Sequence, residues 1–249
     1  MTEVISFISG KGGVGKTTLV SNIGTAIAEM GKKVLVIDGN LSGANLGIHL
    51  GLSNFYPFSL NDVLRGYVSI THAVYRHYLG LDVIPASLTD IEVNPKRLKY
   101  VLKGVIGKKD YILIDSAAGI DNEVRAAVEA SDKAVLVTNP EIPAILDALR
   151  AKALVEKHKR EAAGVVLNKV RKEKHEVRKN EVEEMLSLPV IGEIPHHKKV
   201  REAVALRLPV VYRSPYSKPS LEIKRLSHRL IGEEPPRYSL FYKIRGIFG

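Results

Sequence analysis

Cysteine and tryptophan are absent from this chain of 249 residues, and methionine occurs only three times. A chain without cysteine forms neither disulfides nor the thiolate metal sites of zinc fingers and iron–sulfur proteins. The sequence also lacks an apolar run near 18 residues and an apolar signal segment at its start. We therefore expect a cytoplasmic protein that does not span a bilayer.

Acidic residues are scarce in the second part of the chain. Residues 1–149 carry 14 lysines and arginines against 15 acidic residues, whereas residues 150–249 carry 23 against 12. The net charge of +10 therefore comes from the second part. Such asymmetry indicates an anionic partner, either a membrane surface or nucleic acid.

A glycine-rich segment near the start carries the strongest functional signal. It fits the phosphate-binding pattern G-x-x-x-x-G-K-[ST], and it lies between an apolar run at residues 4–8 and a segment of helical spacing. Its glycines let the backbone approach a polyphosphate and point successive N–H groups at it. The predicted nucleotide-binding residues of this loop are Gly10, Lys11, Gly12, Gly13, Val14, Gly15, Lys16, Thr17 and Thr18.

Two side chains add chemistry to this backbone cradle. Lys16 places a positive charge on the outer phosphates, and the hydroxyl of Thr17 is a ligand for Mg²⁺. The strand-like residues 33–38 end in Asp38, and ligands of open α/β sheets bind at the carboxyl ends of strands. The sequence therefore predicts ATP or ADP with Mg²⁺, and Asp38 near the metal.

Strand-like and helix-like segments alternate along most of the chain. The pattern predicts one α/β domain over residues 1–232: a three-layer, doubly wound, mostly parallel sheet with helices on both faces. Residues 96–105 are expected to be one helix. His72 and His77 do not have the spacing of a helical metal pair, so we interpret them as surface histidines.

The loop resembles the MinD/ParA family of deviant phosphate-loop ATPases, and most of all its MinD branch of septum-site-determining cell-division regulators. The family signature K-G-G-x-G-K-[ST] reads here from Lys11 to Thr17, and the likeness covers residues 1 to about 230. It implies a P-loop NTPase fold of the SIMIBI type and ATP hydrolysis. It also implies a homodimer that forms on Mg-ATP, in which Lys11 reaches the partner's nucleotide.

The same resemblance assigns roles to residues further along the chain. Asp115 would be the Walker B aspartate that holds Mg²⁺ through water, and the backbone of Gly119 would sense the γ-phosphate. Glu141 would contact the nucleotide or the partner subunit. Asn168 would read adenine, and Pro195 lies in the segment that would cover the other face of the base.

Asn40 departs from the family pattern D-x-D, of which only the first aspartate, Asp38, is present. The resemblance makes Lys11, Lys16, Asp38 and Asn40 the candidate catalytic residues. The missing aspartate helps to position or activate water in the family, and an amide does not accept a proton as a carboxylate does. Three explanations stay open: slow hydrolysis, another group that orients the water, or an alteration that traps the ATP state.

The end of the chain, residues 233–249, reads as a proline hinge followed by an amphipathic segment. It resembles the C-terminal membrane-targeting sequence of bacterial MinD, which implies peripheral association with the cytoplasmic side of an anionic membrane. The alternative is a terminal helix packed on its own domain. The apolar side chains on one helical face are Leu240, Phe241, Ile244, Ile247 and Phe248.

Three functions are compatible with these features. The first is a MinD-like ATPase switch that dimerises, docks on the membrane and positions an activating or cargo protein in cell division or spatial organisation. The second is a ParA-like ATPase that holds non-specific DNA in partitioning through the basic second part. The third is a nucleotide-gated scaffold that hydrolyses little ATP.

Overall fold

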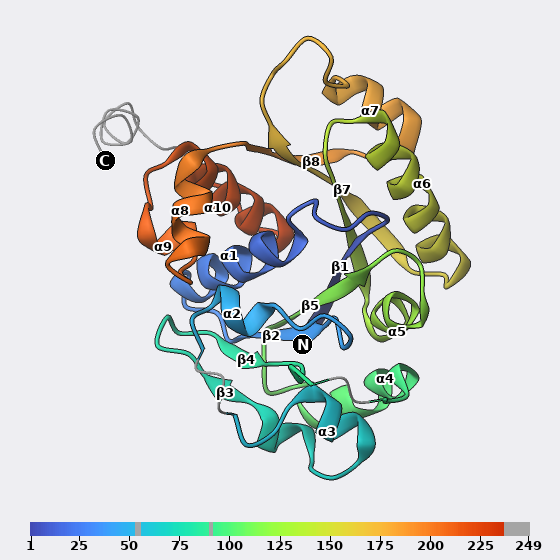
Figure 1. Ribbon diagram of the computed structural model, residues 1–249, viewed down its shortest axis with the longest axis vertical. Coiled ribbons are helices and arrows are strands. Elements are labelled where there is room, and N and C mark those ends of the chain that lie inside the picture. Colours follow the sequence, from blue (N-terminus) through green and yellow to red (C-terminus); the bar gives the residue numbers. More distant parts are fainter. Residues whose placement is uncertain (53–55, 90–91, 237–249) are drawn as a thin grey trace.

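The computed structural model describes residues 1–52, 56–89 and 92–236. Its strands are β1 (Glu3–Ser9), β2 (Val34–Gly39), β3 (Tyr75–Arg76), β4 (Asp82–Ile84), β5 (Tyr111–Ala118), β6 (Lys133–Thr138), β7 (Glu161–Val170) and β8 (Val190–Pro195). They form one sheet in the order β3-β4-β2-β5-β1-β6-β7-β8 (Figure 1). All neighbouring strands are parallel except β3 and β4. Apart from β3, the strands therefore have their carboxyl ends at one edge of the sheet, the carboxyl edge, and their starts at the other, the amino edge.

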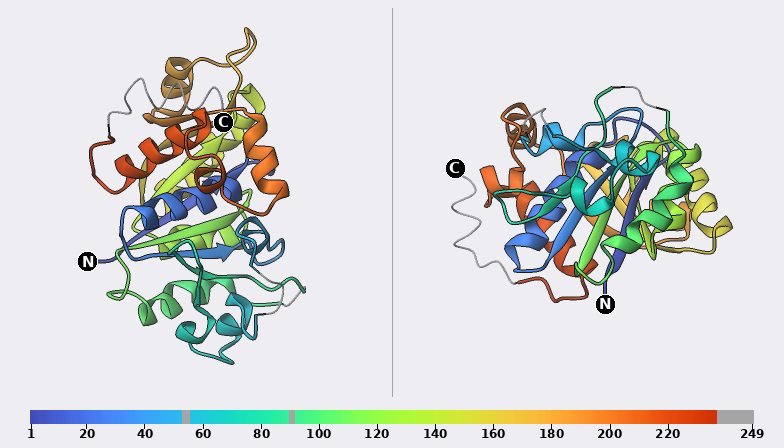
Figure 2. Two further views of the ribbon diagram at one scale, coloured as in Figure 1. Left: turned by 90° about the vertical axis from the view of Figure 1, so that its left-hand side faces the viewer. Right: turned by 90° about the horizontal axis from the view of Figure 1, so that it is seen from below.

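Helices cover both faces of the sheet (Figure 2). One face carries α1 (Lys16–Glu29), α2 (Leu46–His49), α8 (Lys198–Ala205), α9 (Val210–Arg213) and α10 (Lys218–Leu230). The other face carries α3 (Leu60–Arg65), α4 (Leu98–Val101), α5 (Asn122–Ala130), α6 (Ile142–Lys157) and α7 (Lys179–Leu186). The short 3₁₀ helices are η1 (Ile70–Ala73), η2 (Pro95–Arg97) and η3 (Leu102–Gly104). The three-layer fold predicted from the sequence is confirmed.

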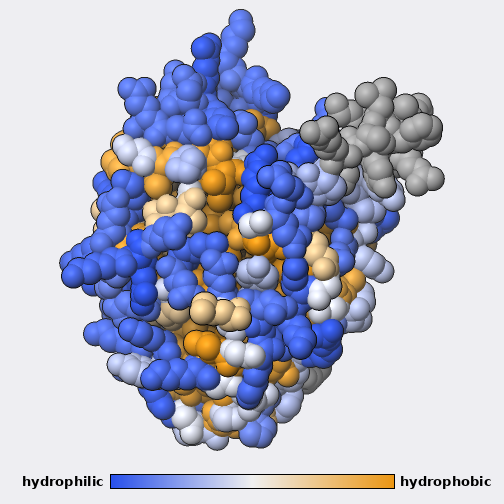
Figure 3. Space-filling model, turned by 180° about the vertical axis from the view of Figure 1, so that it is seen from behind, coloured by the Kyte–Doolittle hydropathy of each residue, from blue (hydrophilic) through white to orange (hydrophobic). Residues whose placement is uncertain are grey.

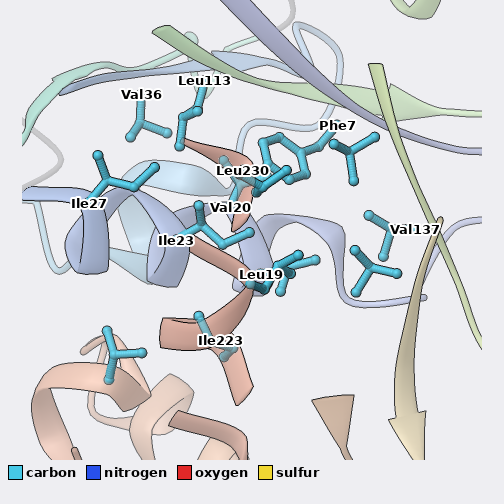
Figure 4. Packing of buried hydrophobic residues seen from close by; sticks show 14 of the residues in the cluster. Phe7, Leu19, Val20, Ile23, Ile27, Val36, Leu113, Val137, Ile223 and Leu230 are labelled. Atoms are coloured by element: carbon cyan, nitrogen blue, oxygen red, sulfur yellow. The ribbon is translucent and has the colours of Figure 1, made fainter. Parts of the chain in front are cut away.

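The core is divided by the sheet because successive side chains of a strand point to opposite faces. Phe7 of β1 packs toward α1 and α10, while the next residue, Ile8, belongs to the cluster under α5 and α6. Figure 4 shows the first cluster, where Ile23 and Ile27 of α1 lie between the sheet and α10. Alternating burial on both faces fixes the register of the central strands, and with it the positions of their carboxyl ends.

Two sequence expectations need correction. Residues 96–105 are not one helix, because the segment is divided into η2, α4 and η3. His77 is not on the surface: it is 3% exposed, and its Nε2 lies 2.7 Å from the carbonyl oxygen of Leu50. The turn between β3 and β4 carries the ring of His77 to the carbonyl of Leu50 at the end of α2, and the sequence gives no local sign of this contact.

The helices among the described residues are all too short or too polar to cross a bilayer. The predicted domain boundary at residue 232 and the amphipathic end of the chain stay predictions, because residues 237–249 lie outside the described part.

Candidate functional site

The glycine-rich loop connects β1 to α1 at the carboxyl edge and packs tightly against its neighbours. Gly13 and Gly15 have φ values of 78° and 92°, a left-handed conformation that favours glycine. A Cβ atom on Gly10 would lie 2.0 Å from the carbonyl oxygen of Asp147, and one on Gly15 would lie 2.4 Å from Nδ2 of Asn168. Side chains at these positions would therefore push the loop away from α6 and β7.

Lys16, the first residue of α1, turns inward and is 7% exposed. Its Nζ lies 3.1 Å from Oδ1 of Asp115 and also donates to the carbonyl oxygen of Ser116. The ammonium group thus neutralises the carboxylate of Asp115, the fifth of the eight residues of β5, which has no exposure to solvent. The loop lysine and the predicted Walker B aspartate are in direct contact.

Asp38 and Asp115 are directly opposite each other in the register of β2 and β5, and both are fully buried. Burial and the charge of Asp115 raise the pKa of Asp38 to about 7, although the N–H groups of Asn40, Asn45 and Leu46 donate to its carboxylate. Two buried carboxyl groups side by side form a site that favours a cation.

The fit to Mg²⁺ depends on the donors at this position. Oδ2 of Asp115 is buried and has no hydrogen-bond partner among the described residues, so one carboxylate oxygen is available. Thr17 is half-buried at the start of α1, next to Lys16. The described part of the chain contains no group of three or more His, Cys, Asp or Glu residues that would hold a metal by itself. Hard oxygen donors in this small number suit a Mg²⁺ ion whose coordination is completed by phosphate and water.

The segment after β2 wraps around Asp38. Nδ2 of Asn40 donates to the carbonyl oxygen of Gly43 at 2.6 Å, so this amide stabilises the turn. The N–H of Leu41 donates to Oε2 of Glu123 at 2.9 Å, which connects the segment to α5. A cavity of about 390 Å³ lies beside them and is lined by Ser42, Ala117, Ala118, Asp121, Asn122, Glu123 and Arg125.

Asn168 and Lys169 of β7, and Asn139 just after β6, hold carbonyl groups of the loop with their side chains. Nδ2 of Asn168 donates to the carbonyl of Val14 at 2.7 Å, and Nζ of Lys169 donates to that of Gly13 at 2.6 Å. Nδ2 of Asn139 donates to the carbonyl of Val14 at 3.4 Å and to that of Asn168 at 2.9 Å. These contacts turn loop carbonyls toward β7.

The remaining predicted residues lie around the same loop. Lys11 and Gly12 are exposed on it, and Thr18 lies 3.5 Å from the ring of His49 through its hydroxyl oxygen. The N–H of Gly119 donates to the carbonyl of Ser9 at 2.9 Å, which holds the end of β5 against the end of β1.

Two predicted residues occupy the rim of the site. Glu141 is exposed at the N-cap of α6, and Pro195 is half-buried at the end of β8. The five apolar residues predicted to contact lipid, Leu240, Phe241, Ile244, Ile247 and Phe248, lie outside the described residues.

Sequence reasoning missed three features of the site: the contact of Lys16 with Asp115, the support from Asn139 and Lys169, and the connection through Glu123. Asn139 directly follows a buried strand and precedes a proline. A polar residue at the carboxyl end of such a strand is a candidate for ligand contact, so this position could have been found from the sequence. Lys169 and Glu123 carry no such signal, because their roles depend on how distant segments meet.

Comparison with known proteins agrees with this geometry. A model of the CobQ/CobB/MinD/ParA nucleotide binding domain matches residues 5–210. An uncharacterized ATP-binding protein of Methanocaldococcus jannaschii is 36% identical over 259 residues, covering 100% of this chain and 98% of that protein.

Two solved structures are similar over nearly their whole length. The septum site-determining protein MinD of Pyrococcus horikoshii, complexed with Mg-ADP, has a TM-score of 0.88 and 32% identity, covering 92% of this chain and 96% of that one. A chain of the MinC:MinD cell division complex of Aquifex aeolicus has a TM-score of 0.84 and 35% identity, covering 95% of this chain and 98% of that one. The resemblance stated for Lys11 to Thr17 is thereby confirmed: the chain belongs to the CobQ/CobB/MinD/ParA family of nucleotide-binding domains.

Proposed function

We propose that this protein is a MinD-like ATPase switch: it binds Mg-ATP, dimerises around the nucleotide and associates with an anionic membrane. The observation that carries the proposal is the group formed by Lys16, Asp38 and Asp115, buried together behind a glycine loop. A P-loop lysine with two carboxylates from neighbouring strands is the donor set that a nucleoside triphosphate and its metal require.

Each residue of the site has a binding role in this proposal. The loop N–H groups and Lys16 would hold the phosphates, while Thr17 and Asp115, assisted by Asp38, would hold Mg²⁺. The ion neutralises phosphate charge when it is bound. The similarity to a MinD protein complexed with Mg-ADP supports this choice of ligand.

Dimerisation is supported by the surface around the loop. Lys11 is exposed, and no ion pair to it occurs within residues 1–52, 56–89 and 92–236. Beside the loop, α6 presents Ile142, Leu146 and Leu149 at one helical face, 49, 48 and 42% exposed. We propose that a second copy covers this face. The MinC:MinD complex of Aquifex aeolicus supports a further protein partner.

Hydrolysis is expected to be slow. Asn40 donates to Gly43 and has no carboxylate with which to accept a proton from water. The γ-phosphate would therefore persist after binding and keep the dimer assembled. Membrane binding then gains from avidity, because two weakly binding chain ends held together raise the overall affinity by about 10²–10⁴.

Titration calorimetry with ATP and Mg²⁺ tests the proposal. Wild-type protein should release or absorb heat on binding, and Lys16→Ala should lose the signal, whereas Lys172→Ala on the β7–α7 connection should keep it. Sedimentation with anionic vesicles tests the switch: more protein should pellet with a non-hydrolysable ATP analogue than with ADP. Absence of nucleotide binding, or equal pelleting, would contradict the proposal.

Non-specific DNA binding is the second candidate, and a cluster of cations favours it. Burial and neighbouring positive charges, including Arg171 and Lys198, lower the pKa values of His196 and His197 at the carboxyl edge. Figure 3 shows hydrophilic side chains projecting at the top of the molecule, where Figure 1 places the β7–α7 connection. If Arg171→Gln with Lys198→Gln abolished localisation while removal of residues 237–249 left it intact, DNA binding would replace membrane binding.

A further inference from the structure

Lys169 has a backbone conformation that is unusual inside a strand. It lies in β7 with a φ value of 60°, in the left-handed region where a side chain is crowded by its own backbone. Asn168 and Val170 are opposite consecutive residues of β8, so Lys169 is an extra residue in the pairing, a β-bulge. Such a conformation persists only where surrounding contacts favour it, which directs attention to what the side chain of Lys169 contacts.

The bulge brings two consecutive side chains to the glycine loop. In a regular strand, Asn168 and Lys169 would point to opposite faces of the sheet. Here Nδ2 of Asn168 donates to the carbonyl of Val14 at 2.7 Å. Nζ of Lys169 donates to the carbonyl of Gly13 at 2.6 Å. The unfavourable backbone of Lys169 therefore coincides with a pair of contacts that regular alternation of side chains would not provide.

The two carbonyl groups determine where N–H groups of the loop point. A trans peptide unit is planar, and its C=O and N–H bonds point in opposite directions. The carbonyl of Gly13 shares a peptide unit with the N–H of Val14, so turning that carbonyl toward β7 turns the N–H to the inner side of the loop. The carbonyl of Val14 has the same relation to the N–H of Gly15. Neither N–H group donates to another residue within the described part of the chain.

The side chain of Lys169 follows the loop closely. A Cβ atom on Gly15 would lie 3.7 Å from Cε of Lys169, which is an ordinary van der Waals distance, so the aliphatic part of the lysine runs along the loop. The residue is exposed, and water therefore competes for its ammonium group. We accordingly expect a modest net contribution from its hydrogen bond to Gly13.

We propose that Lys169 is a positioning residue for the phosphates of Mg-ATP: by holding the carbonyl of Gly13, it aims the N–H of Val14 at the phosphate site. Lys169 acts through the loop and does not itself touch the phosphates. This inference rests on the proposed nucleotide binding and adds how the loop is prepared before the nucleotide arrives. N–H donors that already point inward need no rearrangement when an anion binds, so less free energy is spent on ordering the loop.

The test measures the affinity of the full chain for two probes, Mg-ATP and Mg-tripolyphosphate, by titration calorimetry. Tripolyphosphate offers the phosphates without a base or a ribose. Lys169→Met removes the ammonium group and keeps an unbranched side chain, and it should weaken the binding of both probes about 3- to 30-fold. Lys169→Arg retains N–H donors that can reach the same carbonyl, so it should restore most of the affinity for both probes.

Lys172 provides a matched control on the β7–α7 connection. It is exposed and has a left-handed φ of 63°, like Lys169. Its N–H donates to Oε2 of Glu176 at 2.7 Å, and its side chain forms no hydrogen bond or ion pair with a residue that the structure describes. Lys172→Met removes an equal charge close by, and it should bind both probes like the wild type.

Urea denaturation of Lys169→Gly separates the role of Lys169 in the loop from a role in the fold. Glycine adopts the left-handed conformation without the crowding of a side chain, so this variant should unfold at a urea concentration no lower than that of the wild type. It should nevertheless bind both probes as weakly as Lys169→Met. A loss of binding that is accompanied by lower stability would mean that Lys169 supports the fold in general, and would overturn the inference.

The remaining outcomes separate the inference from the proposed function. Unchanged affinity of Lys169→Met, failure of Lys169→Arg to restore binding, or an equal loss in Lys172→Met would overturn the inference and leave nucleotide binding standing. A loss for Mg-ATP alone would mean that Lys169 contacts the base or the ribose, and would also overturn it. So would wild-type protein that binds Mg-ATP but not tripolyphosphate. Absence of wild-type binding to Mg-ATP would overturn both.

Discussion

The buried carboxyl group of Asp38 should make the nucleotide-free protein less stable as the pH rises. Its pKa is about 7 in the folded chain against an ordinary value of 3.8, first because of burial and second because of the charge of Asp115. A raised pKa means that the folded state binds a proton that the unfolded state has released. The free energy of unfolding therefore falls between about pH 4 and pH 7 and then levels off.

Replacing Asp38 by asparagine removes this titration. At 1.36 kcal/mol per pH unit, the wild type should lose ~3 kcal/mol from this group between pH 5 and pH 8, and the variant should not. The amide will lose some of the three backbone N–H bonds, which costs about 1–3 kcal/mol at both pH values and cancels from the difference. Asp38→Asn should therefore gain ~3 kcal/mol relative to wild type on going from pH 5 to pH 8.

Urea denaturation without nucleotide or Mg²⁺, at the two pH values, measures this difference. Asp121→Asn is the matched control, because Asp121 is an exposed aspartate that precedes α5. Parallel pH dependence of the wild type and Asp38→Asn would refute the idea that Asp38 is protonated in the folded protein near neutral pH.

Three further predictions concern the loop, the core and the reaction. Asn168→Ala removes the hydrogen bond to Val14 and should weaken ATP binding about 5- to 100-fold, measured by calorimetry. Gly24→Ala should destabilise the protein by about 1–3 kcal/mol in urea, because its Cβ would lie 2.5 Å from Cγ2 of Val36; unchanged stability would mean that α1 shifts freely. Asn40→Asp should raise the rate of phosphate release at saturating ATP about 10²- to 10⁴-fold if a proton acceptor is what the site lacks. An unchanged rate would mean that another group orients the attacking water.

The strands and the loop were predictable because their signals are local. The apolar run before Gly10, the glycines and the aspartates that follow the apolar residues of β2 and β5 each appear within a few residues. The sequence alone therefore predicts the edge near which Lys16, Asp38 and Asp115 meet. The start of α3 has a local signal of the same kind, since Ser59 and Asp62 form a capping box.

The contacts between distant segments were not predictable in this way. The burial of His77 depends on a carbonyl 27 residues earlier, and the interaction of Lys169 with Gly13 spans 156 residues. The ammonium group of Lys16 can bind either of two anions, a phosphate group of the nucleotide or the carboxylate of Asp115. In this structure it binds Asp115. Sequence patterns identify the lysine but do not say which partner it contacts when no nucleotide is present.

The pairing of Lys16 with Asp115 sets an order of events at the site. In the nucleotide-free protein one carboxylate already has an internal counter-ion, so a free divalent ion arriving alone meets a position whose charge is largely satisfied. A bound polyphosphate would attract the ammonium group of Lys16 and so leave the carboxylate of Asp115 free to bind a metal ion. We therefore expect Mg²⁺ alone to bind weakly at this position and to bind more tightly together with the nucleotide.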